Sequence, residues 1–312
     1  QLRDISINKD YTGICGITKN EMQDVLMPEI EIMAEDNDLS TEECLEQLRQ
    51  MYDGYHFYQD TDGMYNPFSL LNALADRNFG SYWFSTGTPT FLLEKMKAVD
   101  FDPKKFTDGT LYADESELTD YRADNPNPVP LLYQTGYLTL KSFDKKYRSY
   151  ELGYPNNEVR YGFIKSLAPM YIEREGEMQP LDLRSFCRDI EKGDLTSLRD
   201  RFTAIFARLP YTTGEKPVEQ NFQNVIYVIF MLMGQYVNTE VHSAKGRADC
   251  IVETDDFVYI FEFKRDGTAE EALRQIEDSG YAAAYAADNR TLYKIGVNFD
   301  TGNRSLSEWK VE

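Results

Sequence analysis

The chain has 312 residues, of which 42% are hydrophobic and 13% aromatic, so it is expected to fold, and to form about two domains. Its formal net charge of −20 argues against broad, non-specific affinity for DNA, because nucleic-acid-binding proteins usually present a basic face. Residues 211–312 hold 10 Lys/Arg against 17 Asp/Glu, so any basic groove must be local or must come from another segment or a partner.

The sequence carries no targeting signal that we can identify, and we expect a cytoplasmic protein. No run of about 18 apolar residues exists, so no membrane span is expected, and the opening stretch lacks the basic flank and apolar core of a secretory signal. Gln1 stands first in place of Met, so an excised fragment is one interpretation of the chain. The two histidines, His56 and His242, lie too far apart in the sequence to favour a histidine-based triad or metal site.

The spacing of the cysteines also favours a cytoplasmic protein. The four cysteines include no CxxC pair, which favours buried thiols in a reducing environment over disulfides or zinc. They are Cys15, Cys44, Cys187 and Cys250.

Residues 1–122 are expected to form a mainly helical region. Thr18 with Glu21 and Ser40 with Glu43 make capping boxes, which predict two helix starts, and the aromatic-rich stretches that follow are interpreted as core and turns. Three prolines at 123–130 begin a second region, 123–210, which is expected to contain a linker, a hairpin and a helical connector.

In residues 211–312 the pattern changes from mainly helical segments to strands with helices between them, which predicts a separate domain. After the turn-forming stretch YTTGEKP we expect a helix, three strands, a helix that begins at Thr268 with Glu271 in its capping box, and two more strands. The expected strands are at 237–242, 248–253, 258–263, 291–300 and 304–312. This α-β-β-β-α-β order predicts an α+β fold class: a helical N-terminal region followed by a mixed sheet with helices packed on it.

Two acids stand in these apolar strands, Asp249 and Glu262. A symmetric turn centred on Asp255-Asp256 would pair Val252 with Tyr259. It would also place the two acids opposite each other, with Cβ atoms about 4.5–5.5 Å apart, and Lys264 would point to the same face. Because facing carboxylates repel, we expect a bound Mg²⁺ or Mn²⁺ between them, with the carbonyl of Phe263 as a further candidate ligand. Lys264 would orient or deprotonate an attacking water, or neutralise developing charge.

The D-x12-E-x-K pattern of Asp249, Glu262 and Lys264, in this order of elements, resembles the PD-(D/E)xK nuclease superfamily. Ala248 stands where many members have proline, a common departure. The resemblance implies a restriction-endonuclease-like domain that hydrolyses phosphodiester bonds of nucleic acid, most consistently DNA, with a divalent metal. In one branch of the superfamily a glutamine follows on the next helix, and Gln275 matches it.

The same resemblance implies further site residues, each of which has a plainer interpretation. Glu240 and Glu219 match acids that contact the metal in some members, but the first could pair with a nearby cation and the second could be an ordinary helix residue. Arg247 could contact substrate phosphate or make a salt bridge, and Gln275 could be a solvated helix position.

The N-terminal two-thirds is similar to the C-terminal part of AAA-ATPase-like proteins that end in such a nuclease domain. The similar stretches include MYDGYHFY and MYNPFSLLNAL. The chain has no G-x-x-x-x-G-K-[ST] motif, so we expect no ATP hydrolysis by this chain alone, and an ATPase core is an implied partner. A catalytically inactive, nuclease-like binding or regulatory module is the alternative function, and RNA the alternative substrate. The sequence does not indicate an oligomeric state.

Overall fold

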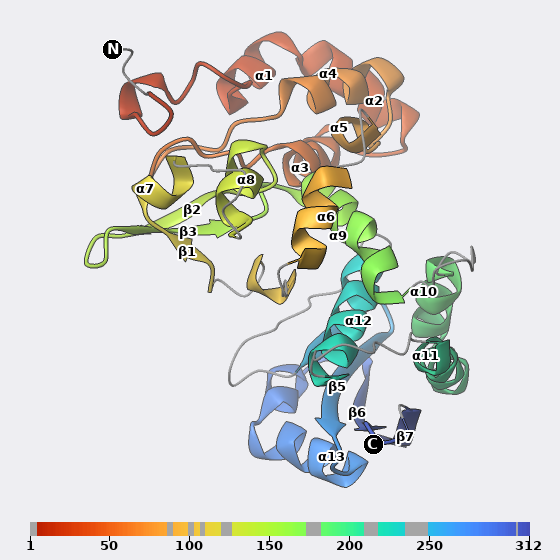
Figure 1. The fold of residues 1–312 in the computed structure, drawn as a ribbon. Coiled ribbons are helices and arrows are strands. Elements are labelled where there is room, and N and C mark those ends of the chain that lie inside the picture. Colours follow the sequence, from red (N-terminus) through yellow and green to blue (C-terminus); the bar gives the residue numbers. More distant parts are fainter. Residues whose placement is uncertain are drawn as a thin grey trace. The chain divides into compact units, whose positions relative to one another are not determined.

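The computed structural model divides the chain into two units, Gln1–Ser166 and Leu167–Glu312 (Figure 1). It describes residues 5–85, 90–98, 103–106, 110–119, 127–172, 182–208, 218–234, 249–303 and 305–312. The boundaries expected at 122/123 and 210/211 both fall outside these ranges, so the three-part division stays a prediction. In the described ranges, no helix is long and apolar enough to cross a bilayer.

The first unit begins with a run of helices. They are η1 Lys9–Tyr11, α1 Lys19–Val25, α2 Met27–Asp36, α3 Thr41–Tyr52, α4 Pro67–Asp76, α5 Tyr82–Ser85, α6 Thr90–Ala98 and η2 Pro103–Phe106. The predicted capping boxes at Thr18 and Ser40 are confirmed at the starts of α1 and α3. Tyr52 and Tyr65, from the predicted aromatic core, are buried against α2, α3 and α4.

A small antiparallel sheet follows the helices of the first unit. Its elements are β1 Tyr112–Ala113, α7 Glu115–Thr119, α8 Val129–Gln134, β2 Thr139–Asp144 and β3 Ser149–Gly153, and the strand order is β1-β3-β2. The hairpin expected in this stretch is confirmed as β2 and β3. Helix α9, Asn157–Ile172, continues the chain.

In the described part of the second unit, three complete helices precede a mixed sheet. The helices are α10 Leu183–Lys192, α11 Leu195–Arg208 and α12 Val218–Met233. After them come β4 Cys250–Glu253, β5 Phe257–Arg265, α13 Ala269–Asp278, η3 Tyr281–Tyr285, β6 Thr291–Asp300 and β7 Ser305–Val311. The sheet order is β4-β5-β6-β7, with β5 and β6 parallel and the other pairs antiparallel, which confirms the expected mixed sheet. The strand expected at 237–242 lies outside the described residues.

Each face of this sheet is covered by different helices, because residues along a strand alternate between faces. Tyr259 and Phe261 of β5 pack in the large core that includes α10, α11 and α12. Ile260 faces the other way and packs with Leu273 and Ile276 of α13. Even-numbered residues of β5 therefore face α13, and this face carries the candidate site.

A glycine lets α13 approach the sheet closely. A Cβ added at Gly296 of β6 would lie 2.2 Å from the carbonyl oxygen of Ala269, the first residue of α13, and 2.9 Å from Leu273 Cγ. Gly296 is paired with Glu262 of β5, so the start of α13 is seated beside that acid. A backbone contact of this kind cannot be relieved by moving one flexible side chain, so any larger residue would displace the helix.

Three of the four thiols behave as the sequence predicts. Cys44, Cys187 and Cys250 are buried and free. Cys15 is exposed, which corrects the expectation that all four are buried. Its neighbourhood differs because it precedes the first buried helix residue, Met22, and belongs to a loop at the surface of the first unit.

Candidate active site

The register of the β4–β5 hairpin decides which face each acid occupies. The pairing predicted from a symmetric turn is confirmed, since Val252 pairs with Tyr259 and Cys250 with Phe261. Continued by one residue, this register puts Asp249 opposite Glu262. Ile251, two residues after Asp249, packs against the α13 cluster, so the acid that precedes it lies on the same face.

Asp249 lies directly before β4, and Glu262 lies in the neighbouring strand β5. The backbone N–H of Phe263 donates to Asp249 Oδ2 at 2.9 Å, which holds this carboxylate against β5. Asp249 is exposed, whereas Glu262 is only 2% exposed. One carboxylate is therefore open to solvent and its neighbour is buried in the sheet.

Lys264 and Gln275 complete the group. Lys264 Nζ lies 3.4 Å from Glu262 Oε1 and donates a short hydrogen bond to Gln275 Oε1. Gln275 belongs to α13, which starts at the confirmed capping box of Thr268. The structure therefore brings Asp249, Glu262, Lys264 and Gln275 together from one sheet face and the helix above it.

Burial controls the electrostatics of Glu262. Its pKa rises to about 7, first because burial removes the carboxylate from water and second because the Asp249 charge repels it, while Lys264 opposes the rise. Its Oε2 atom is buried, with no hydrogen-bond partner in the described part of the chain. An ionised carboxylate in this position is costly unless a cation or a proton neutralises it.

The donor set suits a small, hard divalent cation. Mg²⁺ is usually held by one or two carboxylates and keeps several waters, so Asp249 and Glu262 suffice as protein ligands. Such an ion would satisfy the Oε2 atom of Glu262, which no described residue contacts through a hydrogen bond. Within the described ranges no group of three or more His, Cys, Asp or Glu side chains that could hold a metal ion gathers.

For four other predicted site residues the structure leaves the proposed role untested. Glu240 and Arg247 lie outside the described residues. Glu219 is in the first turn of α12, and its side-chain direction is outside what the structure describes. Phe263 lies in β5 with its N–H bound to Asp249, and the ligand role of its carbonyl stays a prediction.

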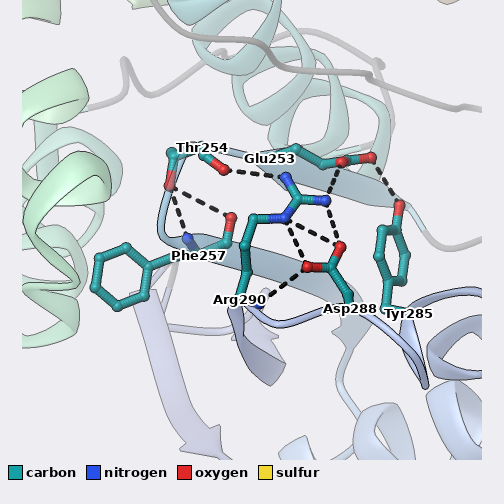
Figure 2. Close-up of polar contacts among 6 residues, drawn as sticks. All are labelled: Glu253, Thr254, Phe257, Tyr285, Asp288 and Arg290. Atoms are coloured by element: carbon teal, nitrogen blue, oxygen red, sulfur yellow. Dashed lines mark hydrogen bonds and ion pairs between the residues drawn. The ribbon is translucent and has the colours of Figure 1, made fainter.

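Arg290 fixes the turn end of the same hairpin (Figure 2). Its guanidinium donates to Asp288 Oδ2 at 2.6 Å, to Glu253 Oε2 at 2.7 Å and to the carbonyl oxygen of Thr254 at 3.0 Å. The hydroxyl of Tyr285 donates to the other oxygen of Glu253 at 2.9 Å. We call these residues the Arg290 clamp. It ties the end of β4 to the segment before β6 and so resists a shift in the register of β4.

Sequence reasoning missed the Arg290 clamp and Gly296. Glu253 and Arg290 are 37 residues apart, and nothing in their local sequence marks them as partners. A glycine inside an apolar strand pattern, as in YKIGVNF, is a recognised signal of close backbone approach and could have identified Gly296.

Comparison with known proteins agrees with this geometry for the second unit. Residues 217–309 match the sequence model of the PD-(D/E)XK nuclease superfamily. A curated relative, described as an uncharacterized protein in the vnfD 5' region of Azotobacter chroococcum mcd 1, is 30% identical over 328 aligned residues, covering 100% of this chain and 59% of that protein. The chain thus spans about three-fifths of the length of the relative it matches. No solved structure matches. Residues 217–309 therefore form a domain of the PD-(D/E)XK nuclease superfamily.

Proposed function

We propose that the second unit hydrolyses phosphodiester bonds of DNA with Mg²⁺ or Mn²⁺. The observation that supports this most is the buried Oε2 of Glu262, which has no hydrogen-bond partner among the described residues and lies with Asp249 and Lys264 on one face of the sheet. A purely structural strand gains nothing from a buried carboxylate with a raised pKa, whereas a metal-dependent phosphodiesterase needs a strong anionic site.

In this proposal Asp249 and Glu262 hold the ion through their carboxylate oxygens. The ion would neutralise phosphate charge and make a bound water more acidic. Lys264 lies beside Glu262 and would orient the attacking water and stabilise charge on the phosphate oxygens. Gln275 accepts a hydrogen bond from the Lys264 ammonium and would hold it in place.

The reaction itself is a simple hydrolysis. The oxygen of water adds to phosphorus, and the phosphorus–oxygen bond to one neighbouring sugar breaks. One proton from water ends on the departing sugar oxygen, so the products are a hydroxyl end and a phosphomonoester end. The chain supplies positioning and charge for this step, and no covalent bond to a side chain is required.

We further propose that the nuclease domain works together with an AAA-ATPase-like region. The support is the likeness of MYDGYHFY and MYNPFSLLNAL to such proteins. Glu219, Glu240 and Arg247 remain proposed supporting residues, the two acids for the metal and the arginine for substrate phosphate.

The test is a cleavage assay on linear, circular, single-stranded and branched DNA, with RNA in parallel, at several concentrations of Mg²⁺ and Mn²⁺. We expect cleavage of DNA that EDTA abolishes and that Asp249→Asn and Glu262→Gln both remove. Lys165→Gln is a suitable control, because this exposed lysine lies in the first unit. No cleavage of any substrate, together with no metal binding by calorimetry, would favour the inactive binding module instead.

A further inference from the structure

The loop between β2 and β3 carries an unusual concentration of positive charge for this chain. Residues 145–148 read KKYR, and no other four-residue stretch of the sequence contains three Lys/Arg. The whole chain has a net charge of −20, so a local basic site stands out against an acidic background. In Figure 1 this loop projects beyond α7 and α8 of its own unit.

The β2–β3 hairpin that carries this loop is stabilised by cross-strand contacts. Phe143 and Tyr150 pair across the strands with ring centroids 4.7 Å apart. Nearby, Ser142 Oγ donates to Glu151 Oε2 at 2.7 Å. Cross-strand contacts of these kinds stabilise a hairpin, so the loop is attached to an ordered pair of strands.

The acid next to the loop, Asp144 at the end of β2, is bonded to the backbone of the loop. Asp144 Oδ1 accepts the backbone N–H groups of Lys146 at 2.7 Å and Tyr147 at 3.0 Å, which is a turn-stabilising use of an aspartate. Arg148 has a φ of 53°, a left-handed conformation that closes the turn. The Asp144 carboxylate thus bonds to the backbone, and the three cations of the loop are exposed.

The side chains of the loop are available to a partner. Lys145, Lys146 and Arg148 are exposed, and none of them forms an ion pair with another described residue. Tyr147 is 69% exposed, the highest value among the exposed large hydrophobic side chains of the described ranges. Lys146 Nζ lies 4.7 Å from the centre of the Tyr147 ring, so charge and aromatic surface are adjacent.

We propose that this loop, residues 145–148, is a nucleic-acid contact separate from the nuclease domain. Lys145, Lys146 and Arg148 would bind backbone phosphates, and Tyr147 would stack on an unpaired base. Exposed cations beside one aromatic ring fit this polyanion better than a lipid surface, because membrane-binding segments usually bury a broad apolar face. The inference rests on the proposed nucleic-acid substrate but not on cleavage.

The first experiment measures binding of a fluorescent DNA duplex to the whole chain in EDTA, across 50–200 mM salt. The variant changes Lys145, Lys146 and Arg148 together to Gln. The matched control changes three exposed lysines elsewhere, Lys9, Lys165 and Lys192, to Gln. We expect the slope of log affinity against log salt to fall by up to about 3 in the loop variant, since each lost phosphate contact removes about 0.9.

The second experiment uses a single-stranded oligonucleotide and changes Tyr147. We expect Tyr147→Ala to weaken binding about tenfold or more and Tyr147→Trp to keep it, because stacking needs an aromatic ring. Circular dichroism checks that each variant is folded. Equal losses in the loop variant and the lysine control would overturn the proposal, as would a wild-type protein that binds vesicles of phosphatidylserine and phosphatidylcholine but no DNA.

The design separates this proposal from the nuclease assignment. Loop-dependent binding without cleavage of any substrate would support the loop and contradict the proposed nuclease activity. Metal-dependent cleavage with binding that is unaffected by the loop variant would support the nuclease and refute the loop.

Discussion

Replacing Glu262 by Gln tests the physical basis of the site without needing a substrate. Glu262 is 2% exposed, and its pKa is raised from an ordinary value of 4.5 to about 7 by burial and by the Asp249 charge. A raised pKa means that the folded state holds a proton more tightly than the unfolded state. Without metal, this group therefore favours folding below pH 4.5, and that contribution is lost as the pH rises through about 7.

The magnitude follows from the size of the shift. About 2.5 pKa units at about 1.4 kcal/mol each give roughly 3 kcal/mol of lost stability for the ionised group at pH 8. Glutamine has nearly the same shape and cannot ionise, so Glu262→Gln should recover up to this amount at pH 8 and little at pH 4.5. For a unit of this size, 3 kcal/mol corresponds to a rise in Tm of about 6–12 °C.

The assay is thermal and urea unfolding of wild type and Glu262→Gln in EDTA at pH 4.5, 6, 7 and 8. Asp249→Asn is the matched variant, because it removes the neighbouring charge and should give a smaller gain with the same pH trend. Excess Mn²⁺ should stabilise the wild type and not the Glu262 variant. A Glu262→Gln protein that is equally destabilised at every pH would refute the claim that ionisation of this buried carboxylate destabilises the fold.

Three further predictions concern the site and its surroundings. Gly296→Ala should lower the free energy of unfolding in urea by about 1–3 kcal/mol, because the new Cβ would lie 2.2 Å from the carbonyl oxygen of Ala269. An unchanged urea midpoint would contradict the close packing of α13 on the sheet. Arg290→Met should lower the free energy of unfolding by about 1–3 kcal/mol and increase hydrogen exchange in β4. The control Arg199→Met breaks an exposed ion pair and should change the free energy of unfolding by under about 0.5 kcal/mol. Lys264→Met should lower the cleavage rate at least about 100-fold at saturating metal, and near-normal turnover would exclude its proposed role.

Much of the second unit could be predicted because its signals are local. The polar turn at Asp255 and Asp256 fixed the centre of the hairpin, and the register of Val252 with Tyr259 followed from it. The capping box at Thr268 marked the start of α13. Alternation along β5 then placed Glu262 and Lys264 on one face, and the contact between them is present in the structure.

Other features depend on contacts between distant segments, which local patterns do not encode. The bond between Lys264 and Gln275 requires α13 to lie close to the sheet, and that distance is set by Gly296 on a strand later in the chain. The burial of Glu262 is the larger cause of its raised pKa and depends on the same packing, so sequence could anticipate only the repulsion by Asp249. The Arg290 clamp likewise forms only after β6 has paired beside β5.

The most direct test of the account is a crystal of the protein soaked in Mn²⁺ and measured at the manganese absorption edge. We predict an anomalous peak within about 2.0–2.3 Å of a carboxylate oxygen from each of Asp249 and Glu262, with water completing the coordination. A saturating soak that leaves this position empty, or places manganese away from both carboxylates, would contradict the proposed metal-dependent nuclease site.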